Sequence, residues 1–179
     1  MSSTSVKTFA STDPGASALS GSAGSQLAIV KTCLVDGRGA GAVATLVVAA
    51  GIATATYSAG HPFAVGSVGL FAGATPVELN GEKRILSVST NAVTFAAPGV
   101  ADGAATGSIT SKLAAAGWQQ LYAGTNLAAL KPSVVEATGC VLRIDDTGTT
   151  NARVRAFEAM TDVSSGVGLT PMESQVAGG

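Results

Sequence analysis

Few residues of this chain could do chemistry, and a single histidine, His61, is the ordinary candidate for a general base. It precedes Pro62 in a short turn that contains Gly60. A catalytic triad needs a base within hydrogen-bond reach of a nucleophile, and the residues around His61 do not form a Gly-x-Ser-x-Gly elbow. We therefore predict that His61 caps a neighbouring backbone group, and we expect no catalytic residue and no enzyme activity.

Two adjacent carboxylates, Asp145 and Asp146, form the most suggestive acidic motif. In a strand they would point to opposite faces. In a turn they could converge with Asn151 and backbone carbonyls on a Ca²⁺ ion. The segment lacks the spacing and the terminal Glu of an EF-hand loop, so the favoured interpretation is an Asx-type turn bonded to its own backbone. Cation binding is the alternative.

Three arginines, Arg143, Arg153 and Arg155, are expected on one sheet face of the last predicted hairpin. They could bind phosphate. Because acidic residues lie beside them in the sequence, ion pairs between subunits are the favoured use.

The two cysteines, Cys33 and Cys140, are far apart in the sequence. Tetrahedral zinc sites need three or four ligands, which this chain does not offer at close spacing. We predict two buried thiols that behave as small apolar side chains. A bond between them, or one across a subunit boundary, is the alternative, and we expect no metal and no cofactor.

The composition is poor in charge. Of 179 residues, 46% are hydrophobic, 12% are charged and 4% are aromatic, and the net charge is −1. Soluble domains carry roughly 25% charged residues, while disordered chains are rich in charge and poor in apolar residues. Such a balance excludes disorder and predicts no binding to nucleic acid or to an anionic membrane surface.

No Asp, Glu, Lys or Arg occurs from Gly39 to Val77. A membrane-spanning helix needs about 20 predominantly apolar residues. Here Thr residues, repeated Gly and Pro62 interrupt every such window. The N-terminus has no apolar stretch behind Lys7 that would make a signal peptide, so we expect no membrane segment and synthesis in the cytoplasm.

One helix is predicted, at residues 24–36. Leu27, Val30 and Leu34 recur at helical spacing, and Gly37 occupies the position of a left-handed C′ residue. Residues 1–20 are rich in Ser, Thr, Ala and Gly and are predicted to form an extended arm or an edge strand. The tail, residues 166–179, has no periodicity and is predicted to lie extended on another surface.

Short apolar runs between Gly- and Pro-containing turns predict a mainly β fold of small antiparallel barrel or sandwich modules. Asn80-Gly81 is a strong turn signal, because such turns require positive φ angles. The predicted strands are Val43–Ala49, Ile52–Ser58, Ser67–Phe71, Arg84–Thr90, Ala92–Ala97, Gly107–Ser111, Trp118–Tyr122, Leu127–Leu130, Cys140–Ile144 and Ala152–Met160. The last four are expected to form two hairpins.

The middle of the chain resembles a small β-module common in structural proteins of tailed bacteriophages. In this module a His-x-x-x-Val-Gly turn, here His61–Gly66, precedes a strand, an Asn-Gly turn follows, and a Thr-Phe strand closes the unit. The segments that carry the resemblance are Ser58–Val68, Gly73–Pro76, Leu79–Glu82, Ser87–Phe95 and Ala105–Thr110.

The rest of the chain is similar to a family of phage virion structural proteins. The similar segments are Ala18–Ser25, Cys33–Gly37, Ala116–Trp118, Ala123–Ala128, Leu142–Gly148 and Ala152–Val163. The family offers no established catalytic residues to carry over. The resemblance implies an outer β domain formed by residues 1–40 and 113–179, with the β-module inserted at residues 41–112.

This resemblance implies a structural component of a tailed-phage virion, and a capsid-decorating or cementing subunit is slightly favoured. A tail, neck or baseplate subunit is the first alternative, and a host-surface or carbohydrate adhesion module is the second. The expected partners are copies of this chain and other virion proteins, with no nucleic acid and no membrane. The expected location is the virion, after synthesis in the host bacterial cytoplasm. On this interpretation the missing charge reflects surface buried against other subunits.

Overall fold

The computed structural model describes residues 3–134 and 137–171. The chain divides into two compact units, unit 1 (Met1–Ser17 and Asp36–Ala116) and unit 2 (Ala18–Val35 and Gly117–Gly179). The fold is mainly β, with one short helix near the N-terminus and a curled antiparallel sheet, as the sequence predicted. Among the described helices, none has the length and apolar character needed to cross a membrane.

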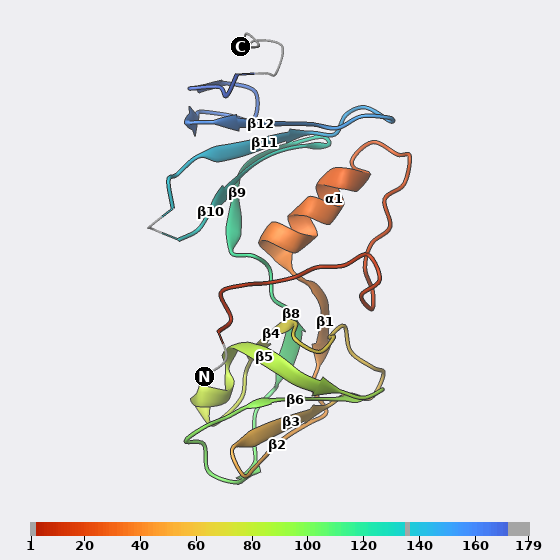
Figure 1. Ribbon diagram of the computed structural model, residues 1–179, viewed down its shortest axis with the longest axis vertical. Coiled ribbons are helices and arrows are strands. Elements are labelled where there is room, and N and C mark those ends of the chain that lie inside the picture. Colours follow the sequence, from red (N-terminus) through yellow and green to blue (C-terminus); the bar gives the residue numbers. More distant parts are fainter. Residues whose placement is uncertain (1–2, 135–136, 172–179) are drawn as a thin grey trace, which may run out of the picture. The chain divides into compact units, whose positions relative to one another are not determined.

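Unit 1 is an eight-stranded antiparallel sheet that curls into a half-barrel (Figure 1). The strand order is β1-β8-β4-β5-β6-β3-β2-β7. The strands are β1 (Arg38–Ala42), β2 (Thr45–Ala49), β3 (Ile52–Thr56), β4 (Val68–Ala72), β5 (Gly81–Val88), β6 (Ala92–Ala96), β7 (Gly103–Ala104) and β8 (Thr110–Leu113), and a 3₁₀ turn, η2 (Val77–Leu79), precedes β5.

The bend of this sheet lies within β5. Gly81–Arg84 pair with β4, whereas the register with β6 begins at Ile85↔Phe95 and shifts before Ser87. An irregularity of this kind increases local twist and turns a strand from one neighbour to another. The two halves of β5 therefore join two differently oriented parts of the sheet.

A row of aromatic rings fills the concave side of unit 1. Tyr57, Phe63, Phe71 and Phe95 are buried, and successive ring centroids lie 6.2, 6.0 and 4.6 Å apart. The Tyr57 hydroxyl hydrogen-bonds the hydroxyl of buried Ser111 at 2.9 Å, and burial raises the pKa of Tyr57. These rings replace the larger aliphatic side chains that an Ala- and Gly-rich sequence lacks.

Unit 2 is a four-stranded antiparallel sheet with a helix on one face (Figure 1). The strand order is β12-β11-β10-β9. The strands are β9 (Trp118–Gly124), β10 (Leu127–Pro132), β11 (Val141–Asp145) and β12 (Arg153–Phe157), and the short pair β13 (Ala159–Met160) and β14 (Gly166–Val167) follows. The helix is α1 (Ser25–Lys31), continued by a π-helical turn, η1 (Thr32–Asp36).

The two faces of this sheet have separate apolar clusters. Leu27, Val30 and Leu34 of the helical segment pack on Leu130 and Ile144. On the other face a second cluster forms around three buried residues, with Tyr122 and Phe157 packed against them. The buried residues are Ala129, Val141 and Met160. The helix at residues 24–36 and both predicted hairpins, β9–β10 and β11–β12, are confirmed.

Three features differ from the sequence predictions. The strand β1 was not predicted, because its Gly-Ala-Gly-Ala run has little strand propensity and is ordered by pairing with β8. In the Asn80-Gly81 turn only Gly81 has a positive φ (87°), while Asn80 is extended and its side-chain amide both accepts from and donates to Ala74. The start of the tail is paired, since Val167 lies opposite Ala159, and residues 172–179 lie outside the described part.

Residues 3–17 of the N-terminal arm cluster with unit 1 and residues 18–20 with unit 2, whereas the sequence assigned all of residues 1–20 to the outer part. The arm has no strand pairing. Lys7 forms an ion pair with Glu82 at 3.0 Å, and Asp13 forms one with Arg38 at 2.8 Å. Phe9 packs against the aromatic core. These side-chain contacts, which no local pattern could reveal, decide where the arm lies.

Candidate functional site

His61 is engaged with the backbone through both ring nitrogens. Its Nδ1 accepts a hydrogen bond from the Phe63 amide at 3.3 Å, and its Nε2 lies 2.8 Å from the carbonyl oxygen of Ser89. A carbonyl only accepts, so Nε2 donates to Ser89 while Nδ1 accepts from Phe63. This is the capping role that the sequence predicted. The same two bonds occupy the nitrogens that a general base would use.

The carboxylates of Asp145 and Asp146 serve different partners. Asp145 accepts from the Thr147 hydroxyl at 2.7 Å and from Arg143 at 3.3 Å, and the Thr147 hydrogen bonds, ahead of the Arg143 charge, hold the pKa of Asp145 below its ordinary value. The Thr147 amide also donates to Asp145 at 3.4 Å, which is the predicted Asx-type bond to the local backbone. For Asp146 the prediction of a local bond is wrong. Asp146 is buried and accepts from the Leu27 amide at 2.9 Å.

The role of Asp146 is therefore that of an N-cap supplied from elsewhere in the chain. The position before the helix is Gly24, which has no side chain to cap α1. Instead Asp146 accepts from the amide of the third helical residue and its carbonyl accepts from the Gly24 amide at 2.8 Å. A carboxylate there satisfies an orphan N–H and complements the helix dipole. This role has no signature in the sequence, because no short-range motif connects Asp146 with Leu27.

The three arginines share one face of the unit 2 sheet, as predicted. Arg143 lies directly opposite Arg155, and Asp145 lies directly opposite Arg153, in the β11–β12 register. The Arg143 guanidinium also donates to the carbonyl of Val163 at 2.7 Å. The face is thus a mixed-charge surface rather than a purely basic one.

The structure forms no disulfide between Cys33 and Cys140. Cys33 is half-buried and Cys140 is exposed, so the prediction of two buried thiols is wrong for Cys140. Cys140 lies directly before β11, at a position where the chain enters the sheet from the surface. Among the described residues, no group of three or more His, Cys, Asp or Glu side chains could hold a metal ion.

The surface best suited to contact with another molecule is one face of β2, β3 and β6. In these strands buried residues alternate with exposed or half-buried ones. The register places Val47 beside Thr54 and Thr54 beside Thr94. We call the outward-facing set the neutral face; it consists of Thr45, Val47, Ala49, Ile52, Thr54, Thr56, Ala92, Thr94 and Ala96.

The neutral face carries no charged residue. The hydroxyls of Thr45 and Thr56 bond each other at 2.6 Å, and the hydroxyl of Thr94 bonds that of Ser87 on β5 at 2.6 Å. Val47 and Ile52 remain 41% and 38% exposed. Since the hydroxyls are partly satisfied within the face, the surface can be covered at a low desolvation cost.

Most of the charge in unit 1 lies elsewhere, although the Asp102 carboxylate accepts from the Ala50 amide in the β2–β3 turn at 2.9 Å. Glu82, Lys83 and Arg84 lie on the half of β5 that pairs with β4, and Arg38 and Lys112 lie on β1 and β8. The N-terminal arm binds this charged part through Lys7 and Asp13. The charge-free stretch from Gly39 to Val77 supplies β2 and β3 of the neutral face and also most of β1 and all of β4 near the other end of the sheet, while β6 comes from outside this stretch.

All eight aromatic residues belong to the apolar clusters. Five lie in unit 1, and Trp118, Tyr122 and Phe157 lie in the two clusters of unit 2. Carbohydrate stacking sites require exposed aromatic faces. Phe9, Trp118, Tyr122 and Phe157 are only partly buried, and each of them packs against one of these clusters.

Comparison of the chain with protein-family models, with curated proteins and with solved structures finds no match.

Proposed function

We propose that this protein is a non-enzymatic structural subunit of a tailed-phage virion, with a capsid-decorating or cementing role favoured. The observation that carries the proposal is the neutral face, an exposed sheet surface without charge. The resemblance of the sequence to phage virion proteins supplies the biological context. Copies of this chain and other virion proteins, such as the major capsid protein, are the proposed partners.

A surface without charge is typical of a permanent contact between subunits. Subunits of a symmetric assembly bury much of their surface against neighbours, and permanent interfaces are apolar and depleted in charge at their centres. A free monomer normally uses surface charge to stay soluble. A neutral face on an already charge-poor chain is suited to a surface that stays covered.

The size of the face favours many weak contacts over one strong dimer. Three strands of five residues span about 16 Å by about 15 Å at ordinary strand spacings. A stable pairwise interface needs about 800 Å² from each partner, more than this face offers. Repetition on a lattice adds such contacts together through effective concentration, which suits a decoration subunit.

Copy number distinguishes the decoration role from a tail, neck or baseplate role. Quantitative mass spectrometry of purified virions is expected to give hundreds of copies per particle, arranged by capsid symmetry. A ring of about six or twelve copies would instead assign the chain to the tail or neck. Absence of the chain from purified virions would overturn the structural role itself.

A further inference from the structure

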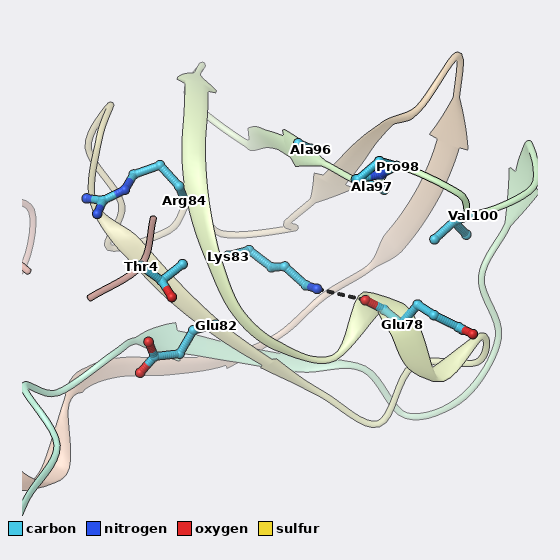
Figure 2. Close-up of a pocket in the computed structure, with 9 residues that line it drawn as sticks. All are labelled: Thr4, Glu78, Glu82, Lys83, Arg84, Ala96, Ala97, Pro98 and Val100. Atoms are coloured by element: carbon cyan, nitrogen blue, oxygen red, sulfur yellow. Dashed lines mark hydrogen bonds between the residues drawn. The ribbon is translucent and has the colours of Figure 1, made fainter. Parts of the chain in front are cut away.

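A pocket of about 370 Å³ lies in unit 1 where β5 parts from β6 (Figure 2). Its apolar wall is formed by Ala96–Pro98 and Val100, and Thr4, Lys83 and Arg84 line the other side. The β5–β6 register begins only at Ile85↔Phe95, so the earlier residues of β5 diverge from the end of β6 and leave this space. Its volume lies within the range of small-ligand sites.

Two cations at this pocket have neutral acceptors. The Lys83 ammonium extends along the pocket and donates to the carbonyl of Glu78 at 2.7 Å (Figure 2). The Arg84 guanidinium donates to the carbonyls of Ser3 at 2.6 and 3.0 Å and of Val6 at 2.8 Å. Burial lowers the pKa of Lys83, as expected where a cation loses water without gaining a carboxylate.

The carboxylates at the pocket do not neutralise Lys83. Glu82 forms its ion pair with Lys7 at 3.0 Å. The Glu78 side chain points away from the Lys83 ammonium in Figure 2, where only its backbone carbonyl accepts. The charged residues that line the pocket, Glu78, Glu82, Lys83 and Arg84, sum to zero. Because Lys7 pairs with Glu82 from outside the pocket, no glutamate of the lining is paired with the Lys83 ammonium.

We propose that this pocket binds a carboxylate carried on a short apolar group. The carboxylate would lie on the Lys83 ammonium, and the apolar group would lie against Ala96–Pro98 and Val100. A carboxylate accepts charge-assisted hydrogen bonds from an ammonium. A phosphate is disfavoured, because bidentate phosphate binding uses an arginine fork and that of Arg84 is occupied by backbone carbonyls.

This ligand chemistry has two possible sources, a free small carboxylate or an Asp or Glu side chain of a neighbouring subunit. The first arm of the test is a titration of the full isolated chain with sodium butyrate, followed by amide chemical shifts in NMR spectra. We expect saturable shifts at residues 82–84, 96–97 and 99–100. Butanol, which has the same apolar chain without the charge, is expected to give no saturable shift.

Substitutions distinguish butyrate binding at this pocket from a general effect of salt on the spectra. Lys83→Met is expected to weaken butyrate binding at least tenfold, and Lys83→Arg is expected to retain it. Lys112→Met is the matched control, because Lys112 makes the same ammonium-to-carbonyl contact, with Asp36 at 2.7 Å, outside the pocket. Equal butyrate binding by Lys83→Met and the wild type would overturn the proposal.

The second arm treats concentrated chain and purified particles with a carbodiimide. The reagent activates a carboxylate, and an amine in contact displaces the urea to form an amide. A cross-linked peptide that joins Lys83 to an acidic residue of another chain would assign the site to a neighbouring subunit. Butyrate shifts without such a cross-link would assign it to a free small carboxylate, and the absence of both would overturn the proposal. The butyrate arm uses the isolated chain, so its outcome is independent of the proposed virion role.

Discussion

At the scale of single residues, one buried carboxylate organises unit 2. Asp146 has only 4% of its surface exposed and joins the turn after β11 to the start of α1 through the Leu27 amide. Its neighbour Asp145 is bonded within its own turn and to Arg143. Adjacent residues of one type thus have a long-range role and a local role.

We predict that Asp146→Ala lowers the free energy of unfolding by about 1–2 kcal/mol, because it leaves the half-buried Leu27 amide without its acceptor and removes a helix cap. Asp146→Asn keeps an acceptor oxygen and should lose less. Urea denaturation followed by circular dichroism would measure both. Asp145→Ala is the control, and a loss in that variant as large as in Asp146→Ala would contradict the capping role.

At the scale of elements, the β2–β3 hairpin shows strain that can be relieved. Its register pairs Ala49 with Ile52, so Ala50 and Gly51 form a two-residue turn. Both have positive φ angles, 50° and 75°, as a type I′ turn requires. The left-handed region suits Gly51, but a side chain such as that of Ala50 adopts it at a cost of roughly 1 kcal/mol.

We predict that Ala50→Asn stabilises the chain by about 0.5–1 kcal/mol, because Asn tolerates the left-handed conformation. Thermal and urea unfolding would measure the change. The reciprocal control is Asn126→Ala in the β9–β10 turn, where Asn126 has a φ of 56° and the substitution should destabilise. A destabilising Ala50→Asn would show that the turn does not hold this strain in solution.

At the scale of the whole molecule, the distribution of charge matters more than its amount. The neutral face occupies β2, β3 and β6, and most charged residues of unit 1 lie toward β1, β8 and the first half of β5, with Asp102 at the β2–β3 turn as an exception. This segregation predicts that self-association uses one particular surface.

We predict that Val47→Lys weakens self-association of the isolated chain about tenfold or more, since an ammonium would have to be desolvated at the contact. Sedimentation equilibrium over a range of concentrations would measure the change. Val65→Lys is the matched control, because Val65 is a 65% exposed valine outside the neutral face. Equal weakening by the two variants, or the absence of even weak self-association of the wild-type chain at high protein concentration, would contradict the role of the face.

The sequence was sufficient to predict the β class, the helix at residues 24–36, the two hairpins of unit 2 and the absence of charge from Gly39 to Val77. These features follow from local propensity and from periodicity along the chain. The sequence also indicated the capping role of His61, because its bond with the Phe63 amide lies within a local turn. The second partner, the Ser89 carbonyl, is brought to His61 only by the fold.

The tertiary structure alone decided how distant segments combine. It brought Asp146 to the start of α1, ordered the Gly- and Ala-rich strand β1 on β8, and placed β3 between β2 and β6. It also opened the Lys83 pocket where β5 changes neighbours. The physical reason is that strand order and remote caps depend on contacts between residues far apart in the chain, whereas charge, turn chemistry and periodicity are local properties of the sequence.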